Sequence, residues 1–162
     1  MTTTPAILFY DVVVAIHVMT IVIAFGVTFV YPAIIPWLTN KHPEAMPTIH
    51  EMQVRIGRFV ITPFATLALL TGIYLAADRD LFDQTWVTIP FVIIIILLGL
   101  GGAFFTPREK QLAALARRDI DAGGTLSDEY HGRAKPVALV GALSSLLILF
   151  AIFCMVAKPF AS

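Results

Sequence analysis

Residues 12–40 read VVVAIHVMTIVIAFGVTFVYPAIIPWLTN, a stretch without a single charged side chain. A helix needs about 20 apolar residues to cross the hydrocarbon core of a bilayer, so this stretch is long enough to span a membrane. Three further stretches share the property: no Asp, Glu, Lys or Arg lies between Arg58 and Asp78, between Asp83 and Arg108, or between Lys135 and Lys158. A water-soluble protein would place charges on the outer faces of such helices. The sequence therefore predicts an all-α transmembrane four-helix bundle.

Composition supports the same class. The chain has 162 residues, of which 58% are hydrophobic and 14% charged, and its mean hydropathy is +0.85. We expect one integral membrane domain over residues 1–162, with spans at about residues 7–37, 59–77, 86–105 and 137–157. The first stretch is too long for a cleavable signal peptide and lacks a basic n-region, so we interpret it as a retained span. The formal net charge of zero argues against nucleic acid as a partner and leaves the lipid bilayer as the expected one.

The basic residues predict the orientation. Nine of the 11 Lys and Arg residues fall in the first and third loops, and only Arg79 and Lys158 fall on the opposite side. Because basic loops stay in the cytoplasm, we expect both termini on the outer (periplasmic or extracellular) side of a bacterial inner membrane. Residues 107–120, PREKQLAALARRDI, favour a helical extension at the cytoplasmic membrane surface. Thr125 or Ser127 is expected to cap the helix that leads into the fourth span.

His17 lies well inside the first apolar span, where an ionisable side chain usually faces the protein interior or a cofactor. At 100° per residue, most polar side chains of this span fall on one stripe of the helix. The stripe comprises Tyr10, His17, Thr20, Ala24, Thr28 and Tyr31. We therefore expect the stripe to face other helices, and Val, Ile and Phe to contact lipid.

Two interpretations of His17 stay open. In the first, a neutral imidazole hydrogen-bonds Thr20, a facing Ser144 or Ser145, or a backbone carbonyl. In the second, an imidazole nitrogen is the metal ligand of a b-type haem buried in the bundle. The chain has no second histidine at this depth, so a site with two histidine ligands from one chain is not expected. Met19 or Met155 could be the other axial ligand.

The remaining candidates lie outside the apolar centres of the spans. Arg58 follows Arg55 by one turn and could hold a carboxylate or a lipid phosphate, or serve only to set the topology. The candidate cofactor-binding residues are therefore His17, Thr20, Tyr31 and Arg58. His42, His50 and His131 are expected in cytoplasmic loops, where His42, His50 and Glu51 offer an alternative zinc site.

Several activities are disfavoured by what the spans lack. None of the four uncharged stretches contains Asp or Glu, which argues against an ion-coupled transporter. The sequence has no glycine-rich phosphate loop and no pattern of an acyl-transfer triad. The single cysteine, Cys154, cannot form an internal disulfide.

Short apolar motifs resemble a group of four-span bacterial membrane proteins. HVMTIVIAFG at residues 17–26 with FVYP at residues 29–32 resembles their first helix, and RFVITP at residues 58–63 with LLTGIY at residues 69–74 resembles their second. VAKPF at residues 156–160 resembles the C-terminus of the HemJ-type protoporphyrinogen oxidases. The group also contains the CopD-like domain and the DUF2269 family, which is the nearest in pattern.

The resemblance implies a function as well as a fold. In HemJ-type proteins the histidine of the first helix is associated with b-type haem, which carries over to His17. The chain departs from that pattern at Ala24, where a Trp is expected, and at Ala33, where an Arg is expected. We therefore expect a b-type haem-binding, redox-linked membrane protein, with haem-dependent oxidoreductase activity left open. The alternative is a non-enzymatic accessory subunit, and either protein could belong to a homo-oligomer or a larger membrane complex.

Overall fold

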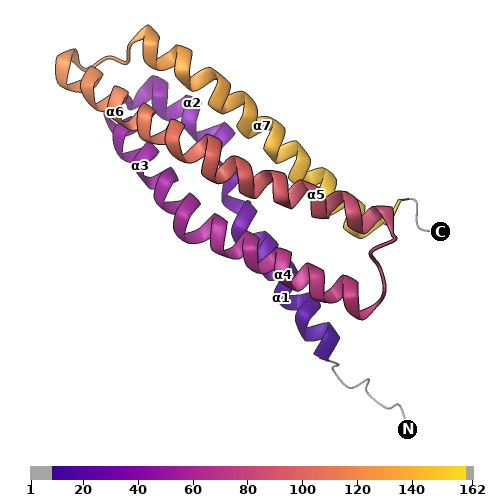
Figure 1. Ribbon diagram of the computed structural model, residues 1–162. Coiled ribbons are helices and arrows are strands. Elements are labelled where there is room, and N and C mark those ends of the chain that lie inside the picture. Colours follow the sequence, from indigo (N-terminus) through magenta and orange to yellow (C-terminus); the bar gives the residue numbers. More distant parts are fainter. Residues whose placement is uncertain (1–8, 160–162) are drawn as a thin grey trace.

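The computed structural model describes residues 9–159 as an antiparallel bundle of four long helical segments (Figure 1). The segments are Phe9–Lys41, Pro43–Asp78, Thr85–Gly123 and Asp128–Ala157, and each is long and apolar enough to cross a membrane. No strand occurs within the described range. The predicted all-α four-helix bundle is thus confirmed. The expected start of the first span at residue 7 and the motif end at residue 160 lie outside the described residues.

Short 3₁₀ and π segments divide the long helices into elements. In chain order these are α1 (Phe9–Phe25), η1 (Gly26–Phe29), α2 (Tyr31–Lys41), η2 (Pro43–Ala45), α3 (Met46–Ile56), η3 (Gly57–Ile61), α4 (Thr62–Asp78), α5 (Thr85–Leu100), η4 (Gly101–Phe105), α6 (Thr106–Gly123) and α7 (Asp128–Ala157). The segments η3 and η4 are π-helices, and η1 and η2 are 3₁₀ helices. Both π segments occur where one long helix continues into the next element without a break.

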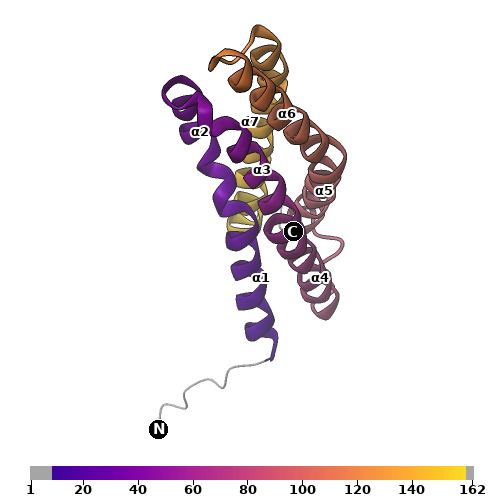
Figure 2. The same ribbon diagram turned by 90° about the vertical axis from the view of Figure 1, so that its left-hand side faces the viewer.

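The two ends of the bundle are built from different helix pairs. At one end α1 packs against α4 and α5 packs against α7, and the loop between α4 and α5 lies there (Figure 1). At the other end α3 packs against α6, next to α2 and the start of α7, as the turned view also shows (Figure 2).

The second and third segments are longer than a bilayer is thick. Their 36 and 39 residues correspond to about 54 and 58 Å of helix, whereas a hydrocarbon core is about 30 Å thick. The end that contains α3 and α6 therefore projects beyond the apolar spans. We expected a polar loop before residue 59 and a helix lying on the membrane surface at 107–120. Both regions are instead helical continuations of the spans, and they pack against one another.

Sequence periodicity explains why α3 and α6 pack together. Leu112 and Ala116 of α6 are almost completely buried with Met46 of α3 and Tyr130 of α7 in one cluster. The apolar positions of α6 recur every three to four residues, which gives the helix one apolar face. A helix lying alone on a membrane would turn that face to lipid, and here α3 and α7 cover it instead.

A polar junction joins α6 to α7. Gly124 ends α6 with a φ of 80°, a left-handed conformation that glycine adopts without strain. Ser127 caps α7 by accepting a hydrogen bond from the amide of Tyr130, as the sequence predicted for Thr125 or Ser127. The hydroxyl and amide of Ser127 donate to Asp119, and with the neighbouring Arg118 guanidinium they lower the pKa of that carboxyl to about 2.

The outward faces of the spans are apolar. Large exposed side chains cover them, including Val22, Phe59, Leu139, Leu146 and Val156. The interior is narrow at the level of Ala24 and Ala65, two small residues that are almost fully buried against Phe25 and Ile148. Small residues at such contacts let helix backbones approach closely in a membrane.

Candidate functional site

His50 is buried in the interior of the bundle. The residue lies in α3 and is only 3% exposed. The prediction that it belongs to a cytoplasmic loop is therefore wrong. Pro43 and Pro47 do not interrupt this region, because each stands in the first turn of a helix, where proline is well tolerated. Met46, Pro47 and His50 then form the buried face of α3.

Two partners from other helices hold the His50 imidazole. Its Nδ1 lies 2.5 Å from Oε2 of Glu109 in α6, and its Nε2 lies 2.8 Å from the hydroxyl of Tyr130 in α7. A carboxylate accepts only, so Nδ1 carries a proton that it donates to Glu109. In a neutral imidazole Nε2 is then an acceptor, and Tyr130 donates to it. The three side chains form a buried chain of hydrogen bonds from a carboxylate through an imidazole to a phenol.

A cavity of about 380 Å³ runs through the bundle beside this chain. His50, Glu109 and Tyr130 line one end, whereas Phe25 and Ile148 line the other. At 1.5 Å per residue, the stretch of α7 from Tyr130 to Ile148 is about 27 Å long, so the cavity is elongated. Most of its wall is apolar, and its volume lies in the range typical of small-molecule sites.

Three buried oxygens on the cavity wall have no protein partner. They are the Tyr31 hydroxyl, Oε1 of Gln53 and the Ser144 hydroxyl, each without a hydrogen bond from any described residue. Buried polar groups in proteins are almost always hydrogen-bonded, to protein, water or ligand. The oxygens of Tyr31 and Gln53 and the His50 chain therefore add polar groups to an apolar cavity, which is the pattern of a ligand site. Ser144 lies toward the Ile148 end.

Two copies of one short motif place glycines on the cavity wall. The pattern of a glycine followed five residues later by Thr-Pro occurs at Gly57 and again at Gly101. Each copy forms a π segment in which the threonine amide donates a hydrogen bond to the glycine carbonyl oxygen. The threonine hydroxyl donates to the same oxygen, with an O–O distance of 2.8 Å in both copies. The prolines lack an amide hydrogen, which explains why the regular helical bonding is interrupted there. π segments are frequent at functional sites, and both glycines line the cavity.

His17 lies elsewhere, at the interface between α1 and α4. Its Nδ1 is 3.0 Å from the hydroxyl of Thr71 in α4. That hydroxyl donates its one proton to backbone carbonyls, with Leu67 O at 2.8 Å, so it accepts from Nδ1–H of His17. The side-chain partner of His17 is therefore Thr71. One interpretation of the sequence expected Thr20, Ser144 or Ser145 in this place. Thr20 bonds the backbone carbonyl of His17 at 2.7 Å.

Gly72 makes room for the imidazole of His17. A Cβ atom at position 72 would lie 3.1 Å from Cε1 of His17, closer than side chains normally approach. The absence of a side chain at Gly72 thus allows the ring to lie against the backbone of α4. The inward-facing stripe predicted for the first helix agrees with this contact and with the burial of Thr20 and Ala24.

The structure brings only part of the predicted cofactor set together. His17 and Thr20 are adjacent, and Tyr31 lines the cavity about two turns beyond Phe25. Arg58 is exposed on the outer surface, where its guanidinium lies 5.6 Å from the ring centroid of Phe59. The alternative zinc site is not assembled either. His42 pairs with Glu44, His50 turns inward to Glu109, and Glu51 pairs with Arg117.

Glu109 and Tyr130 were missed by sequence reasoning, although a signal for Glu109 was present. Counting back in helical steps from the apolar Ala116 and Leu112 of α6 leads to Glu109, so all three share one face. A carboxylate on a face that becomes buried needs a buried partner. No comparable pattern in the sequence indicates that Tyr130 would contact His50, the buried partner of Glu109.

Comparison with known proteins assigns the family. The chain matches DUF2269, described as a predicted integral membrane protein, over residues 11–159, and it belongs to this family. No curated protein and no solved structure matches it. The chain is accordingly an integral membrane protein with four candidate spans.

Proposed function

We propose that this protein binds an elongated lipophilic molecule with an oxygen-bearing head, of the quinone or quinol class. The head lies at the His50 end of the cavity, and the tail extends toward Phe25 and Ile148. The observation that carries this proposal is the pair of unpartnered oxygens of Tyr31 and Gln53 on an otherwise apolar wall that also holds the buried His–Glu–Tyr chain.

The polar groups favour a neutral head that both donates and accepts hydrogen bonds. The Tyr31 hydroxyl can donate to a carbonyl oxygen, whereas Oε1 of Gln53 can only accept, as from a ligand hydroxyl. An anionic head is disfavoured because the carboxylate of Glu109 lines the same end of the cavity. Quinols and quinones carry neutral hydroxyl and carbonyl oxygens on a ring, which matches these requirements.

The His50 chain could also exchange a proton with such a head. Quinone and quinol differ by two protons as well as two electrons. The Tyr130 hydroxyl lines the cavity, so it can take a proton from a quinol hydroxyl while it passes its own to Nε2 of His50. Glu109 stabilises the imidazolium that results, and the reverse transfer returns the proton to the head. This role needs only groups that already touch one another.

Binding of a soluble probe tests the proposal. A benzoquinone with a ten-carbon tail is titrated into the detergent-purified protein, and the dissociation constant is measured by calorimetry. The double variant His50→Leu/Glu109→Leu removes both partners of the pair together, so neither stays buried without the other. We expect its affinity to fall roughly tenfold or more, as for loss of a hydrogen bond to a charged group. His42→Leu, at an exposed histidine, is the control and should bind like the wild type. Equal binding by all three proteins would contradict the proposal.

A second candidate function is haem binding at His17. It is favoured by the hydrogen bond of Nδ1–H to Thr71, which leaves the lone pair of Nε2 for a metal. Ligating histidines commonly donate their other ring hydrogen in this way. Nε2 of His17 therefore fits an axial ligand. His17 does not line the cavity, so a porphyrin would have to lie against the partly exposed surface of the α1–α4 pair. A bound haem would supply one-electron redox chemistry.

Absorption spectra distinguish this candidate. The dithionite-reduced minus oxidised spectrum of wild-type protein should show b-type haem bands, and His17→Ala should remove or markedly shift them. His42→Ala and His131→Ala, at exposed histidines, should leave the spectrum unchanged. A colourless wild-type preparation from cells supplied with a haem precursor would refute haem binding. A protein that binds neither quinone nor haem would fit the accessory-subunit interpretation.

A further inference from the structure

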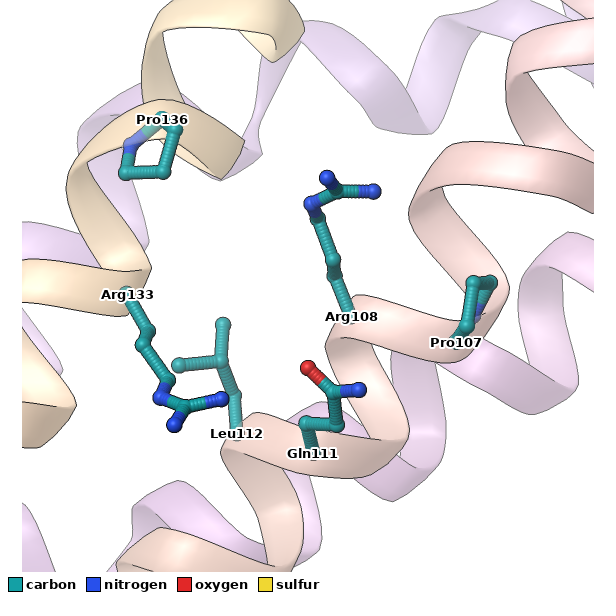
Figure 3. A pocket seen from close by; sticks show the side chains of 6 residues that line it. All are labelled: Pro107, Arg108, Gln111, Leu112, Arg133 and Pro136. Atoms are coloured by element: carbon teal, nitrogen blue, oxygen red, sulfur yellow. The ribbon is translucent and has the colours of Figure 1, made fainter.

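A groove of about 290 Å³ separates α6 from α7 on the outside of the bundle, apart from the cavity described above. Its walls carry two arginines, Arg108 of α6 and Arg133 of α7, and Figure 3 shows both side chains extending into the space between the helices. Gln111, Leu112, Pro107 and Pro136 complete the wall. We propose that this groove binds the phosphate of an anionic phospholipid.

The guanidinium of Arg108 is held in place but keeps its donors free. Its central carbon lies 3.8 Å from the ring centroid of Phe104, a cation–π contact that uses the flat face of the group. The N–H groups point outward from the edges of that plane, so stacking does not occupy them. Within residues 9–159, Arg108 has no carboxylate partner.

The surrounding carboxylates leave the groove positive. Glu109 follows Arg108 in sequence but turns inward to His50. Glu129 lies one turn before Arg133 and forms an ion pair with it, in which an Nη atom of Arg133 is 3.0 Å from Oε1 of Glu129, and it also pairs with Arg118. The other N–H groups of Arg133 therefore stay available to a ligand. The groove is lined by two guanidinium groups, with the Glu129 carboxylate at its margin. Phosphate is well matched to such forked donors.

The position of the groove favours a lipid over a free anion. The apolar stretch of the third span ends just before Arg108, and that of the fourth begins just after Lys135. Both arginines are thus at the level where lipid headgroups meet the hydrocarbon core. Below Pro136, the exposed Leu139 and Leu143 continue on the same face of α7 and offer a surface for an acyl chain.

Native mass spectrometry of the full-length protein in neutral detergent tests this inference. Phosphatidylglycerol, phosphatidylcholine and inorganic phosphate are titrated in turn. Arg108→Gln and Arg133→Gln should each weaken binding of phosphatidylglycerol about fivefold, as expected for one basic residue at the membrane surface. Arg117→Gln is the matched control, because it removes the same charge from α6 at a residue that pairs with Glu51 and lies outside the groove. Arg108→Lys keeps the charge without the fork and should bind at an intermediate level.

Each outcome decides the matter. Loss of binding in both groove variants, with the Arg117 control unchanged and thermal unfolding without lipid unaltered, supports the site. Equal losses of phosphatidylglycerol affinity in all three variants would mean that surface charge alone attracts the lipid, and would overturn the proposed groove site. Displacement of the lipid by equimolar inorganic phosphate, or equal affinity for phosphatidylcholine, would overturn the assignment to an anionic lipid.

Discussion

Nδ1 of His50 and Oε2 of Glu109 lie 2.5 Å apart, although 59 positions separate the two residues in the sequence. Their side chains are 4% and 8% exposed, so water does not screen the contact. The pair links α3 to α6 in the part of the bundle that projects beyond the apolar spans. It fixes the polar end of the cavity, and the orientation of the imidazole toward Tyr130 depends on it.

Removing one member of this pair should destabilise the protein strongly. Glu109→Leu leaves the Nδ1–H of His50 buried without its acceptor, and a buried donor left unsatisfied costs about 1–3 kcal/mol of unfolding free energy. The double variant His50→Leu/Glu109→Leu should recover much of the loss. Chemical denaturation in detergent measures both. Glu44→Gln, in the exposed pair with His42, should leave the stability nearly unchanged, because solvent screens an exposed pair. A Glu109→Leu protein as stable as the wild type would contradict the structural role of the pair.

Gly72 is predicted to accept no larger residue while His17 is present. A leucine there would collide with the imidazole, because even its Cβ would lie 3.1 Å from Cε1 of His17. We expect Gly72→Leu to destabilise by about 1–3 kcal/mol, as for overpacking elsewhere. His17→Ala in the same chain should relieve part of this loss, and a double-mutant cycle measures the coupling. Gly99→Leu, where a Cβ would have open space, is the control. Additive effects of the two substitutions would show that the His17 imidazole and the side chain at position 72 are not in steric contact.

The junction between α6 and α7 should weaken in acid. The pKa of Asp119 is lowered from its ordinary value of 3.8 to about 2 in the folded protein. The stability that this carboxylate contributes is therefore complete above the ordinary value and is lost as pH falls toward 2. Wild-type unfolding temperature should therefore decrease between about pH 4 and pH 2. Asp119→Asn should remove part of this dependence, whereas Asp121→Asn, at an exposed residue of the same helix, should not. Parallel pH profiles for wild type and Asp119→Asn would refute the assignment.

The orientation in the membrane is tested by labelling cysteines. The basic residues of the α2–α3 and α6–α7 end predict that this end is cytoplasmic. A cysteine at Asp80 should then react with an impermeant maleimide in intact cells, whereas one at Gly123 should not. The natural Cys154 is fully buried and gives little background. The reverse pattern of labelling would invert the topology.

Hydropathy was sufficient for the spans because a bilayer admits few solutions for an uncharged stretch of this length. It misjudged the segments outside the spans when each was considered alone. The polar residues around His50 resemble a loop, and the helix around Glu109 resembles one that lies on the membrane surface. These segments bury one face only when paired. The information that α3 and α6 meet is tertiary, and single-sequence periodicity shows the faces but not their partners.

The site was predicted in a different place from the one the structure favours. His17 attracted attention because an ionisable residue deep in a span is easily noticed. His50 was assigned to a cytoplasmic loop, because its burial depends on Glu109 and Tyr130 from two distant helices. The cavity itself could not be predicted, because its wall is assembled from all four helical segments.

The central claim, that the cavity holds a lipophilic ligand, is tested most directly by the protein as it leaves the membrane. Wild type, Gly141→Leu and Gly99→Leu are purified in mild detergent, and bound molecules are identified by native mass spectrometry with organic extraction. Gly141 lines the cavity and Gly99 does not, and a Cβ at either position meets no atom within 4 Å. We predict that a quinone-class molecule accompanies wild type and Gly99→Leu and is absent from Gly141→Leu. A wild-type protein that carries no such molecule, or a Gly141→Leu protein that retains it fully, would contradict the claim.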